Sequence, residues 1–417
     1  MRYFVFLLLI IQSQLSAQTA QNLVTWINFD NPGCEIKDNF GDPGVVIFTP
    51  SELECVCGAT QNGQYFDGSA DDFLILVGPS VENVLGTIDF TLSFYFKADE
   101  QNNTSSTPQV LFAKRDDCRQ DSSFVVKYFP GGSRQISVEL FENPGVSTTV
   151  FASLPNTCWH HIAIVRKGAE VILYHNGIEL KRASTISGQR VRISTEFDLT
   201  IGNSDCTSDS GFRGAMDEIR LYNRSLTRNE VEDLYFFPDN IATGLRLNDL
   251  KDTTIFLGNS VPIQLTETCA HRFSWSPTTG VDNPNIGTPV ITPDVTTTYT
   301  VEMEDSLCTQ FDAIQIIVVD PASIACGDIF LPTAFTPNND GLNDQFGISN
   351  PFSTGEILAF DIYDRWGNIV FSTTNVLEKW DGSYRGTPVN PGVFLYKLQY
   401  RCEGVEDLLS GSVTVVR

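Results

Sequence analysis

Residues 90–96 read Phe-Thr-Leu-Ser-Phe-Tyr-Phe, so a large apolar side chain recurs at every second position. Successive side chains of a β-strand point to opposite faces, and a period of two therefore predicts a strand with one buried face. Residues 197–201 repeat the alternation. Residues 171–180 predict a hairpin, because Asn176-Gly177 supplies the two positive φ angles of a type I′ turn. Almost the whole chain is expected to be strand.

One helix is expected, from Leu226 to about Phe236. Thr227 and Glu230 have the spacing of a capping box, in which each side chain accepts a free backbone N–H group of the other residue. Pro238 ends this helix and places a domain boundary near it. We therefore predict an all-β protein with a segment at 1–20 and three domains at 21–237, 238–321 and 322–417.

The first 20 residues predict a secretory signal peptide. Arg2 precedes an apolar run from Phe4 to Ile11, and a polar stretch then leads to cleavage after Ala17 or Ala20. Nothing later approaches the roughly 18 apolar residues of a membrane span, so no direct membrane insertion is expected. The formal net charge of −24 argues against nucleic acid and anionic lipid as partners.

Ten cysteines in an exported chain predict disulfides rather than a metal cluster. Each predicted domain holds an even number, so we expect every domain to close its own bridges. This predicts the pairs Cys269–Cys308 and Cys326–Cys402. The other six allow 15 connectivities, among which the sequence does not choose: Cys34, Cys55, Cys57, Cys118, Cys158 and Cys206.

Ordered motifs cover most of the first predicted domain, among them Trp159-His-His-Ile-Ala-Ile-Val-Arg166 and Met216-Asp-Glu-Ile-Arg-Leu-Tyr222. The segment resembles laminin-G-like, concanavalin-A-like jelly rolls. This resemblance implies two curved antiparallel sheets. It also implies a module that binds glycans or proteins, although some members are glycosidases.

The two later domains also resemble known families. Residues 275–284 and 296–301 resemble immunoglobulin-like or PKD-like repeats, which implies a spacer. The motifs at 329–344, 362–371 and 380–386 and those at 391–396 and 411–417 resemble the gliding-motility-associated C-terminal domain of Bacteroidetes, a type B sorting domain of type IX secretion. This resemblance implies a small β-sandwich, the type IX secretion machinery as partner, and a location outside the cell or on its outer surface.

No catalytic residue is predicted. A retaining glycosidase needs two carboxyl groups about 5 Å apart on one face. Glu230 lies on the predicted helix and is used in its cap, whereas Asp217 and Glu218 are neighbours on a strand and should point to opposite faces. The same argument separates His160 from His161 and excludes a metal site built from this pair.

No cofactor is required by the sequence, but structural calcium is a candidate, because hard cations prefer carboxylate and carbonyl oxygens. Asp340, Asn343 and Asp344 form one candidate set around a glycine. The resemblance to laminin-G-like domains suggests a second set, Asp30 with Asp217.

Two polar loops, at 114–121 and 203–211, are the predicted ligand-binding elements. Each carries a cysteine that can rigidify it, and rigid polar loops suit sugar hydroxyls or a partner surface. Ordinary solvated loops remain the alternative. The candidate residues are Arg115, Asp116, Asp117, Arg119, Asn203, Asp205 and Asp209.

These observations predict a secreted cell-surface binding or adhesion protein, whose ligand is an extracellular glycan or a cell-surface protein. Two alternatives stay open. One is a divergent polysaccharide hydrolase on the same scaffold, and the other is a structural component of the cell surface or of a motility adhesin.

Overall fold

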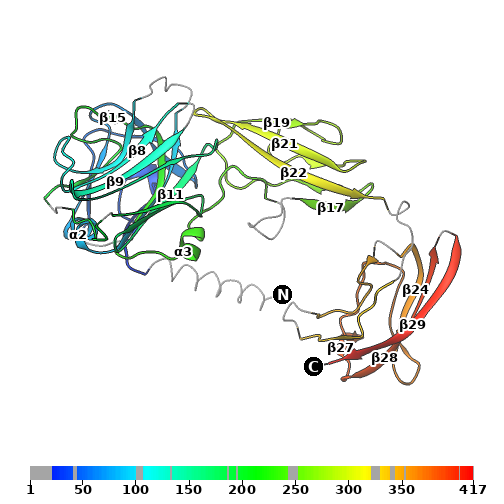
Figure 1. Ribbon diagram of the computed structural model, residues 1–417. Helices are drawn as coiled ribbons and strands as arrows, with labels where there is room; N and C mark the ends of the chain where they lie inside the picture. Colours follow the sequence, from blue (N-terminus) through cyan, green and yellow to red (C-terminus); the bar gives the residue numbers. More distant parts are fainter. Residues whose placement is uncertain are drawn as a thin grey trace. The chain divides into compact units, whose positions relative to one another are not determined.

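The computed structural model describes residues 21–40, 45–99, 107–131, 134–185, 187–193, 196–242, 252–320, 329–338, 343–351, 354–402 and 404–416. The predicted signal peptide, Cys326 and Asp340 lie outside these residues. The chain forms two compact units (Figure 1). The first holds the described residues up to Thr253 with Ser260–Thr292 and Thr298–Gln315, and the second holds Thr254–Asn259, Pro293–Thr297 and the described residues from Ile316.

The jelly roll of the first unit has two eight-stranded sheets. In sheet A the order is β13-β12-β11-β6-β16-β4-β3, and β1 also pairs with β16. The bounds are β1 Leu23–Ile27, β3 Glu54–Cys57, β4 Asn62–Asp67, β6 Phe90–Ala98, β11 His160–Lys167, β12 Glu170–His175, β13 Ile178–Ser184 and β16 Arg213–Tyr222.

Sheet B has the order β10-β9-β8-β7-β14-β5-β2, and β15 also pairs with β7. The bounds are β2 Val46–Phe48, β5 Leu74–Val77, β7 Gln109–Lys114, β8 Ser123–Phe129, β9 Gln135–Asn143, β10 Val146–Ser153, β14 Leu199–Ile201 and β15 Ser210–Gly211. The all-β jelly-roll prediction is confirmed.

The core lies between the two sheets and depends on the alternation in β6. Phe90 and Phe94 point inward and are fully buried, as predicted. Phe94 packs on Phe112 of sheet B at a ring-centroid distance of 4.6 Å, and Phe90 packs on Phe124 at 5.7 Å. Burying such aromatic pairs stabilises the sandwich through removal of apolar area from water.

The predicted helix exists but is shorter than expected. The helix α3 spans Arg228–Glu232 and has the capping box of Thr227 and Glu230. Beyond it the chain lies on the outer face of sheet A, where the Tyr95 hydroxyl donates to Leu234 O at 2.9 Å and accepts from Phe236 N at 2.7 Å. These bonds to the sheet replace further helical turns.

A second helix, α2 (Pro79–Thr87), was not expected from the sequence. The last carbonyls of a helix lack partners within it. The buried guanidinium of Arg166 on β11 donates to Leu85 O at 3.1 Å and also to the carbonyl groups of Val84 and Ile88. A single arginine therefore fixes this helix to sheet A. A 3-10 turn at Pro32–Cys34 completes the helical elements described.

The middle segment forms a four-stranded sheet of order β17-β22-β21-β19 and a two-stranded sheet β18-β20. Trp275 and Tyr299 are buried within it. The bounds are β17 Thr253–Phe256, β18 Val261–Pro262, β19 Arg272–Ser276, β20 Val290–Ile291, β21 Thr297–Glu304 and β22 Thr309–Val319.

The C-terminal region has a five-stranded sheet, β23-β29-β28-β24-β25, and a small sheet β26-β27. Phe394 and Leu398 of β28 are buried, with Tyr396 and Tyr400 packed against the same core, as the alternation predicts. The bounds are β23 Ala334–Phe335, β24 Glu356–Tyr363, β25 Ile369–Thr373, β26 Ser383–Tyr384, β27 Thr387–Pro388, β28 Gly392–Cys402 and β29 Val405–Val415.

The prediction of a Cys269–Cys308 bridge is wrong. Cys269 is bonded to Cys57, and Cys308 is bonded to Cys158. Both bridges therefore join the jelly roll to the middle segment. The prediction failed because it assumed that each domain packs alone, whereas most of the middle segment, Ser260–Thr292 and Thr298–Gln315, shares one compact unit with the jelly roll. The other described bridges are Cys34–Cys55 and Cys118–Cys206.

The second predicted bridge is not tested. Cys402 is disulfide-bonded, but Cys326 lies outside the described residues, so the Cys326–Cys402 pair stays a prediction.

A buried ion pair accompanies the two bridges that join these segments. Lys97 of β6 pairs with Asp305, and their side chains are 1% and 9% exposed. Burial alone raises the pKa of Asp305, but the charge and hydrogen bonds of Lys97 outweigh it and hold that pKa below its ordinary value. Leu307 beside this pair packs with Tyr95 and Trp159 on the outer face of sheet A.

Disulfide mapping of the oxidised protein tests this arrangement. Proteolysis without reduction, followed by mass spectrometry, is expected to release peptides that link Cys57 to Cys269 and Cys158 to Cys308. The reduced sample is the control and should lack both species. A linked peptide that contains Cys269 and Cys308 would contradict the structure.

Removing one member of the ion pair should destabilise the first unit. Asp305→Ala is expected to lower the free energy of unfolding by roughly 3–5 kcal/mol, because it leaves the ammonium group of Lys97 buried and unpaired. Urea denaturation measures the effect. Glu302→Ala, at an exposed position of β21, is the control and should change stability by no more than about 0.5 kcal/mol. Equal effects of the two substitutions would contradict this role.

Candidate functional site

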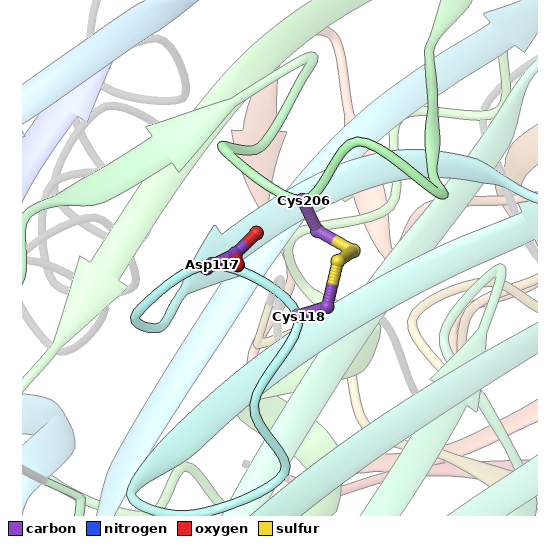
Figure 2. Close-up of side chains that lie close together, drawn as sticks. All are labelled: Asp117, Cys118 and Cys206. Carbon is purple, nitrogen blue, oxygen red and sulfur yellow. A yellow bond between two sulfur atoms is a disulfide. The ribbon is translucent and has the colours of Figure 1, made fainter.

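The structure brings the two predicted ligand-binding loops together at sheet B. One loop, residues 115–122, joins β7 to β8, and the other, residues 202–209, joins β14 to β15. The Cys118–Cys206 disulfide links them, with 4.6 Å between the two Cα atoms (Figure 2). We call these two segments the loop pair. The bridge restricts their motion relative to each other.

A buried ion pair also fixes the two loops of the loop pair to each other. Arg115 pairs with Asp209, and their side chains are only 6% and 7% exposed. Ser204 Oγ accepts from Arg115 at 3.1 Å, and Lys127 Nζ lies 3.4 Å from Asp209 Oδ1. Arg115 and Asp209 were predicted as ligand contacts, but the structure places them where they hold the loops.

The other candidates lie nearer the surface. Asp117, Arg119 and Asp205 are exposed. Asp116 is half-buried and forms an ion pair with Arg119 at 3.0 Å. Asn203 is half-buried, and its amide donates to Ser69 O at 3.1 Å. Among the predicted candidates, these three exposed side chains are therefore the ones that a ligand can reach directly.

Sequence reasoning missed the surface beside the loop pair. Lys127, Ser137 and Phe151 lie in one row across β8, β9 and β10. Phe151 is exposed, and its ring packs edge-on against Phe129 at 5.4 Å. The sequence signal for this surface was the alternation of polar residues with buried apolar residues along β8 and β9. This face of sheet B combines aromatic and polar groups.

Asp117, Cys118 and Cys206 place potential metal-binding atoms within 4.8 Å of one another. Figure 2 shows both sulfur atoms in the disulfide. Metal binding requires a thiolate, which neither cysteine can supply while bonded. Cys118 and Cys206 therefore link the two loops and, while bonded to each other, do not serve as metal ligands.

The prediction that Asp217 and Glu218 point to opposite faces is wrong. A β-bulge interrupts the pairing of β16 with β6 between Asp217 and Arg220, and Glu218 has φ 53°. Because Met216 and Ile219 both lie in the core, the bulge turns both carboxyl groups to the outer side. An extra residue in one strand shifts the alternation of side chains between the two faces by one position for the residues that follow.

These two carboxyl groups are buried. Burial and the neighbouring charge of Glu218 raise the pKa of Asp217 well above its ordinary value. Burial also raises the pKa of Glu218, although Arg220 opposes the shift. Glu218 forms an ion pair with Arg220 and accepts from Trp26 Nε1 at 3.1 Å. In this arrangement a substrate has no direct access to either group.

Asp30 lies close enough to Asp217 for their charges to interact, as the calcium hypothesis supposed. Asp30 accepts from Asn62 N at 3.0 Å and from the Asn28 amide at 3.1 Å, whereas Asp217 accepts from Thr60 N at 3.0 Å. N–H groups of the chain thus already satisfy these carboxylates. Calcium at this place stays a prediction.

The second calcium set is only partly described. Asp344 Oδ1 accepts from Asn338 N at 3.0 Å, and Asn343 O accepts from Thr336 N at 2.9 Å. These are bonds of a turn. Because Asp340 lies outside the described residues, calcium here also stays a prediction.

The histidines of sheet A are buried, and their ring nitrogens contact neighbouring side chains. His160 Nδ1 contacts His175 Nε2 at 2.9 Å, whereas His161 Nε2 contacts Ser93 Oγ at 2.9 Å. Burial, followed by the charge of Arg220, lowers the pKa of His161 to about 3, and burial lowers that of His175 to about 4. The rings are therefore neutral core groups. The contact between His160 and His175 was not foreseen.

Comparison with known families agrees with this architecture. Residues 67–232 match the family model described as Concanavalin A-like lectin/glucanases superfamily, so the first unit contains a domain of that class. Residues 329–415 match the CHU_C Type IX secretion signal domain. This second match identifies a secreted or cell-surface protein. No curated protein matches the chain.

Several solved structures share a general likeness. Domain 4 of a GH43 extracellular arabinanase from Geobacillus stearothermophilus, in complex with arabinotriose, is 18% identical, with 51% of this chain and 98% of that chain covered and a TM-score of 0.38. The Ruminococcus gnavus IT-sialidase CBM40 bound to α2,3 sialyllactose is 15% identical, with 46% and 98% covered and a TM-score of 0.33.

The binding domain of Paraclostridial Mosquitocidal Protein 1 is 14% identical, with 94% of this chain and 89% of that chain covered and a TM-score of 0.43. Likenesses at this level carry no information about a ligand of this chain. No helix among the described residues is long and apolar enough to cross a membrane.

The buried histidines predict a specific pH dependence. As pH falls below about 6.5, an unfolded histidine takes up a proton, but native His161 stays neutral until about pH 3. The stability that its neutral form contributes is complete above about pH 6.5 and is lost toward pH 3. Between pH 8 and pH 5 this residue alone should cost about 2 kcal/mol.

His161→Gln is expected to remove that part of the loss. The free energy of unfolding, measured by urea denaturation at pH 8 and pH 5, should fall by about 2 kcal/mol less in the variant than in the native chain. The difference between the two proteins in this change excludes the contribution of the buried carboxyl groups, because both proteins contain them. His271→Gln, at an exposed position, is the control. The same pH difference in native and His161→Gln proteins would contradict the prediction.

Proposed function

We propose that this chain is an adhesion or binding protein of the cell surface, and that its jelly roll recognises an extracellular glycan or a cell-surface protein through the loop pair. The proposal rests on one observation, the fixed geometry of these loops. The Cys118–Cys206 bridge and the buried Arg115–Asp209 pair hold them together.

Fixed loops favour recognition because they lose little conformational entropy when a ligand binds. Asp117, Arg119 and Asp205 offer charged groups at the surface of the loop pair. The adjoining face of sheet B adds Lys127 and the exposed ring of Phe151. Polar groups that set orientation, beside an aromatic ring that contributes apolar contact, are typical of binding sites.

Binding without turnover is the better supported form of this proposal. A hydrolase of this scaffold needs two carboxyl groups that reach the scissile bond from a shared cleft. Asp217 and Glu218 face the same side, but they are 0% and 3% exposed and are held by bonds within the protein. The loop pair, by contrast, is accessible.

A binding assay on the mature chain, residues 21–417, tests the proposal. The whole chain is needed because Cys57 and Cys158 have their partners in the middle segment. The probes are a glycan array and a set of cell-surface proteins. The triple substitution Asp117→Ala, Arg119→Ala and Asp205→Ala should weaken binding of the captured ligand at least about tenfold, equivalent to about 1.4 kcal/mol.

Arg182→Ala provides the matched control, because Arg182 is an exposed charged residue of β13 in sheet A, outside the loop pair. This variant should bind as the native chain does. Unchanged binding by the triple variant would contradict the assignment of the site. Turnover of a polysaccharide by the native chain would favour the hydrolase alternative instead.

A further inference from the structure

The C-terminal region contains a pocket of about 470 Å³, separate from the loop pair. Small-ligand sites typically have volumes of about 300–1,000 Å³ and combine apolar walls with a few polar groups. This pocket has both. Its lining comes from the turn between β24 and β25, from β25 and β26, and from the segment before and at the start of β28. It includes Asp364, Arg365, Trp366, Val370, Tyr384, Asn390 and Phe394.

Trp366 is the unusual member of this lining. Its side chain is 80% exposed, although tryptophan is a highly buried residue in most folded proteins. The other four tryptophans of the chain are buried or half-buried: Trp26, Trp159, Trp275 and Trp380. An indole ring left in water beside a pocket offers a large, rigid contact surface.

The turn that carries Trp366 is held by its own hydrogen bonds. Asp364 Oδ1 accepts from Trp366 N at 2.8 Å and from Asn368 N at 2.9 Å, and Asp364 Oδ2 accepts from the Asn368 amide at 2.9 Å. Gly367 has φ 81°, which permits the reversal of the chain. The backbone at Trp366 is therefore fixed before a ligand arrives, which lowers the entropic cost of binding.

One arginine and one carboxylate, Arg365 and Asp364, line this pocket, and a second arginine, Arg385, follows the lining residue Tyr384. Arg365 lies 5.8 Å from the centre of the Trp366 ring, and Arg385 lies 5.1 Å from that of Tyr384. Neither arginine forms an ion pair with a residue that the structure describes. Arg401 differs, because Glu356 and Glu406 both pair with it. The oxygens of Asp364 accept bonds within their own turn. In a chain with net charge −24, two arginines beside a pocket with this single carboxylate favour an anionic ligand.

We propose that this pocket binds an anionic saccharide. The sugar ring would lie against the Trp366 indole, with its carboxylate near Arg365, and the Asn390 amide would bond to hydroxyl groups. Arginine matches the geometry of a carboxylate through paired N–H donors. The apolar floor includes Val370 and Phe394, which suits the C–H face of a sugar.

This chemistry favours a saccharide over a protein partner. A stable protein interface buries roughly 800 Å² on each side, whereas this feature is a compact pocket. An extended peptide would use the free backbone groups of a sheet edge. Here the distinctive groups are instead one aromatic platform, one amide and a guanidinium. The site is independent of the jelly-roll loops and of the function proposed for them.

Calorimetric titration of the mature chain tests the proposal. The protein carries the triple substitution in the loop pair, so that the jelly roll does not contribute. The probes are an oligogalacturonate, the same oligosaccharide with its carboxylates methyl-esterified, a heparin oligosaccharide and sialyllactose. At least one carboxylated saccharide should bind, more weakly as salt increases, and the esterified form should bind at least about tenfold more weakly than the oligogalacturonate.

Two variants examine the assigned contacts. Trp366→Ala and Arg365→Gln should each weaken binding at least about tenfold, and Arg365→Gln should also remove the preference for the free carboxylate. The controls are Leu395→Ala, at an exposed apolar position outside the lining, and Arg401→Gln. Unchanged thermal melting checks the fold of each variant.

Three results would overturn the proposal. They are no binding of any of the anionic saccharides, equal affinity for the free and esterified forms, or unchanged affinity after Trp366→Ala. Tight binding of a peptide with a free C-terminal carboxylate, measured alongside, would assign the pocket to a peptide instead. None of these results bears on the loop pair. Its ligand binding is measured in a separate assay, with Trp366 intact and with substitutions in the loop pair itself.

Discussion

The ammonium group of Lys97 lies near the end of a central strand, with almost no access to water. A charge in this position is tolerated only if a partner of opposite sign is fixed beside it. Asp305 supplies that partner from the middle segment, and the two disulfides from Cys57 and Cys158 hold the segment in place. The jelly roll is thus complete only with these later residues.

This packing decides which surfaces remain exposed. The outer face of sheet A is covered by the chain after α3, through Tyr95, and by Leu307 near the ion pair. Sheet B and the loop pair are bordered by exposed charged residues. Most of the middle segment therefore belongs to the first unit, where it covers part of the outer face of sheet A. Its role as a spacer stays a prediction.

Local patterns in the sequence predicted local structure well. The alternation from Phe90 to Phe96, the Asn176-Gly177 turn and the capping box of Thr227 each depend on neighbouring residues alone, and each is present. Predictions that depend on distant segments failed. The partner of Cys269 follows from docking between segments, which no local pattern encodes. The bulge at Glu218 breaks the period of two on which the face assignment relied.

The candidate site was predictable to a similar extent. Polar composition and a cysteine in each loop were sufficient to select the loop pair. Composition could not separate Arg115, which is buried in an ion pair, from Arg119, which is exposed. Nor did it reveal Trp366, because aromatic residues in a strand-rich segment are usually part of a core. Which side of the chain faces water is a property of the assembled sheets.

The spacing of the cysteines imposes an order on oxidation. Cys55 and Cys57 lie on one short strand, yet their partners are 21 residues upstream and 212 residues downstream. If the chain enters an oxidising compartment N-terminus first, Cys34 can react with Cys55 or Cys57 before Cys269 has entered. Pairing of Cys34 with Cys57 would have to be reversed by thiol–disulfide exchange, a process that takes seconds to hours. The Cys57–Cys269 bridge can form only after such a mispair has been exchanged.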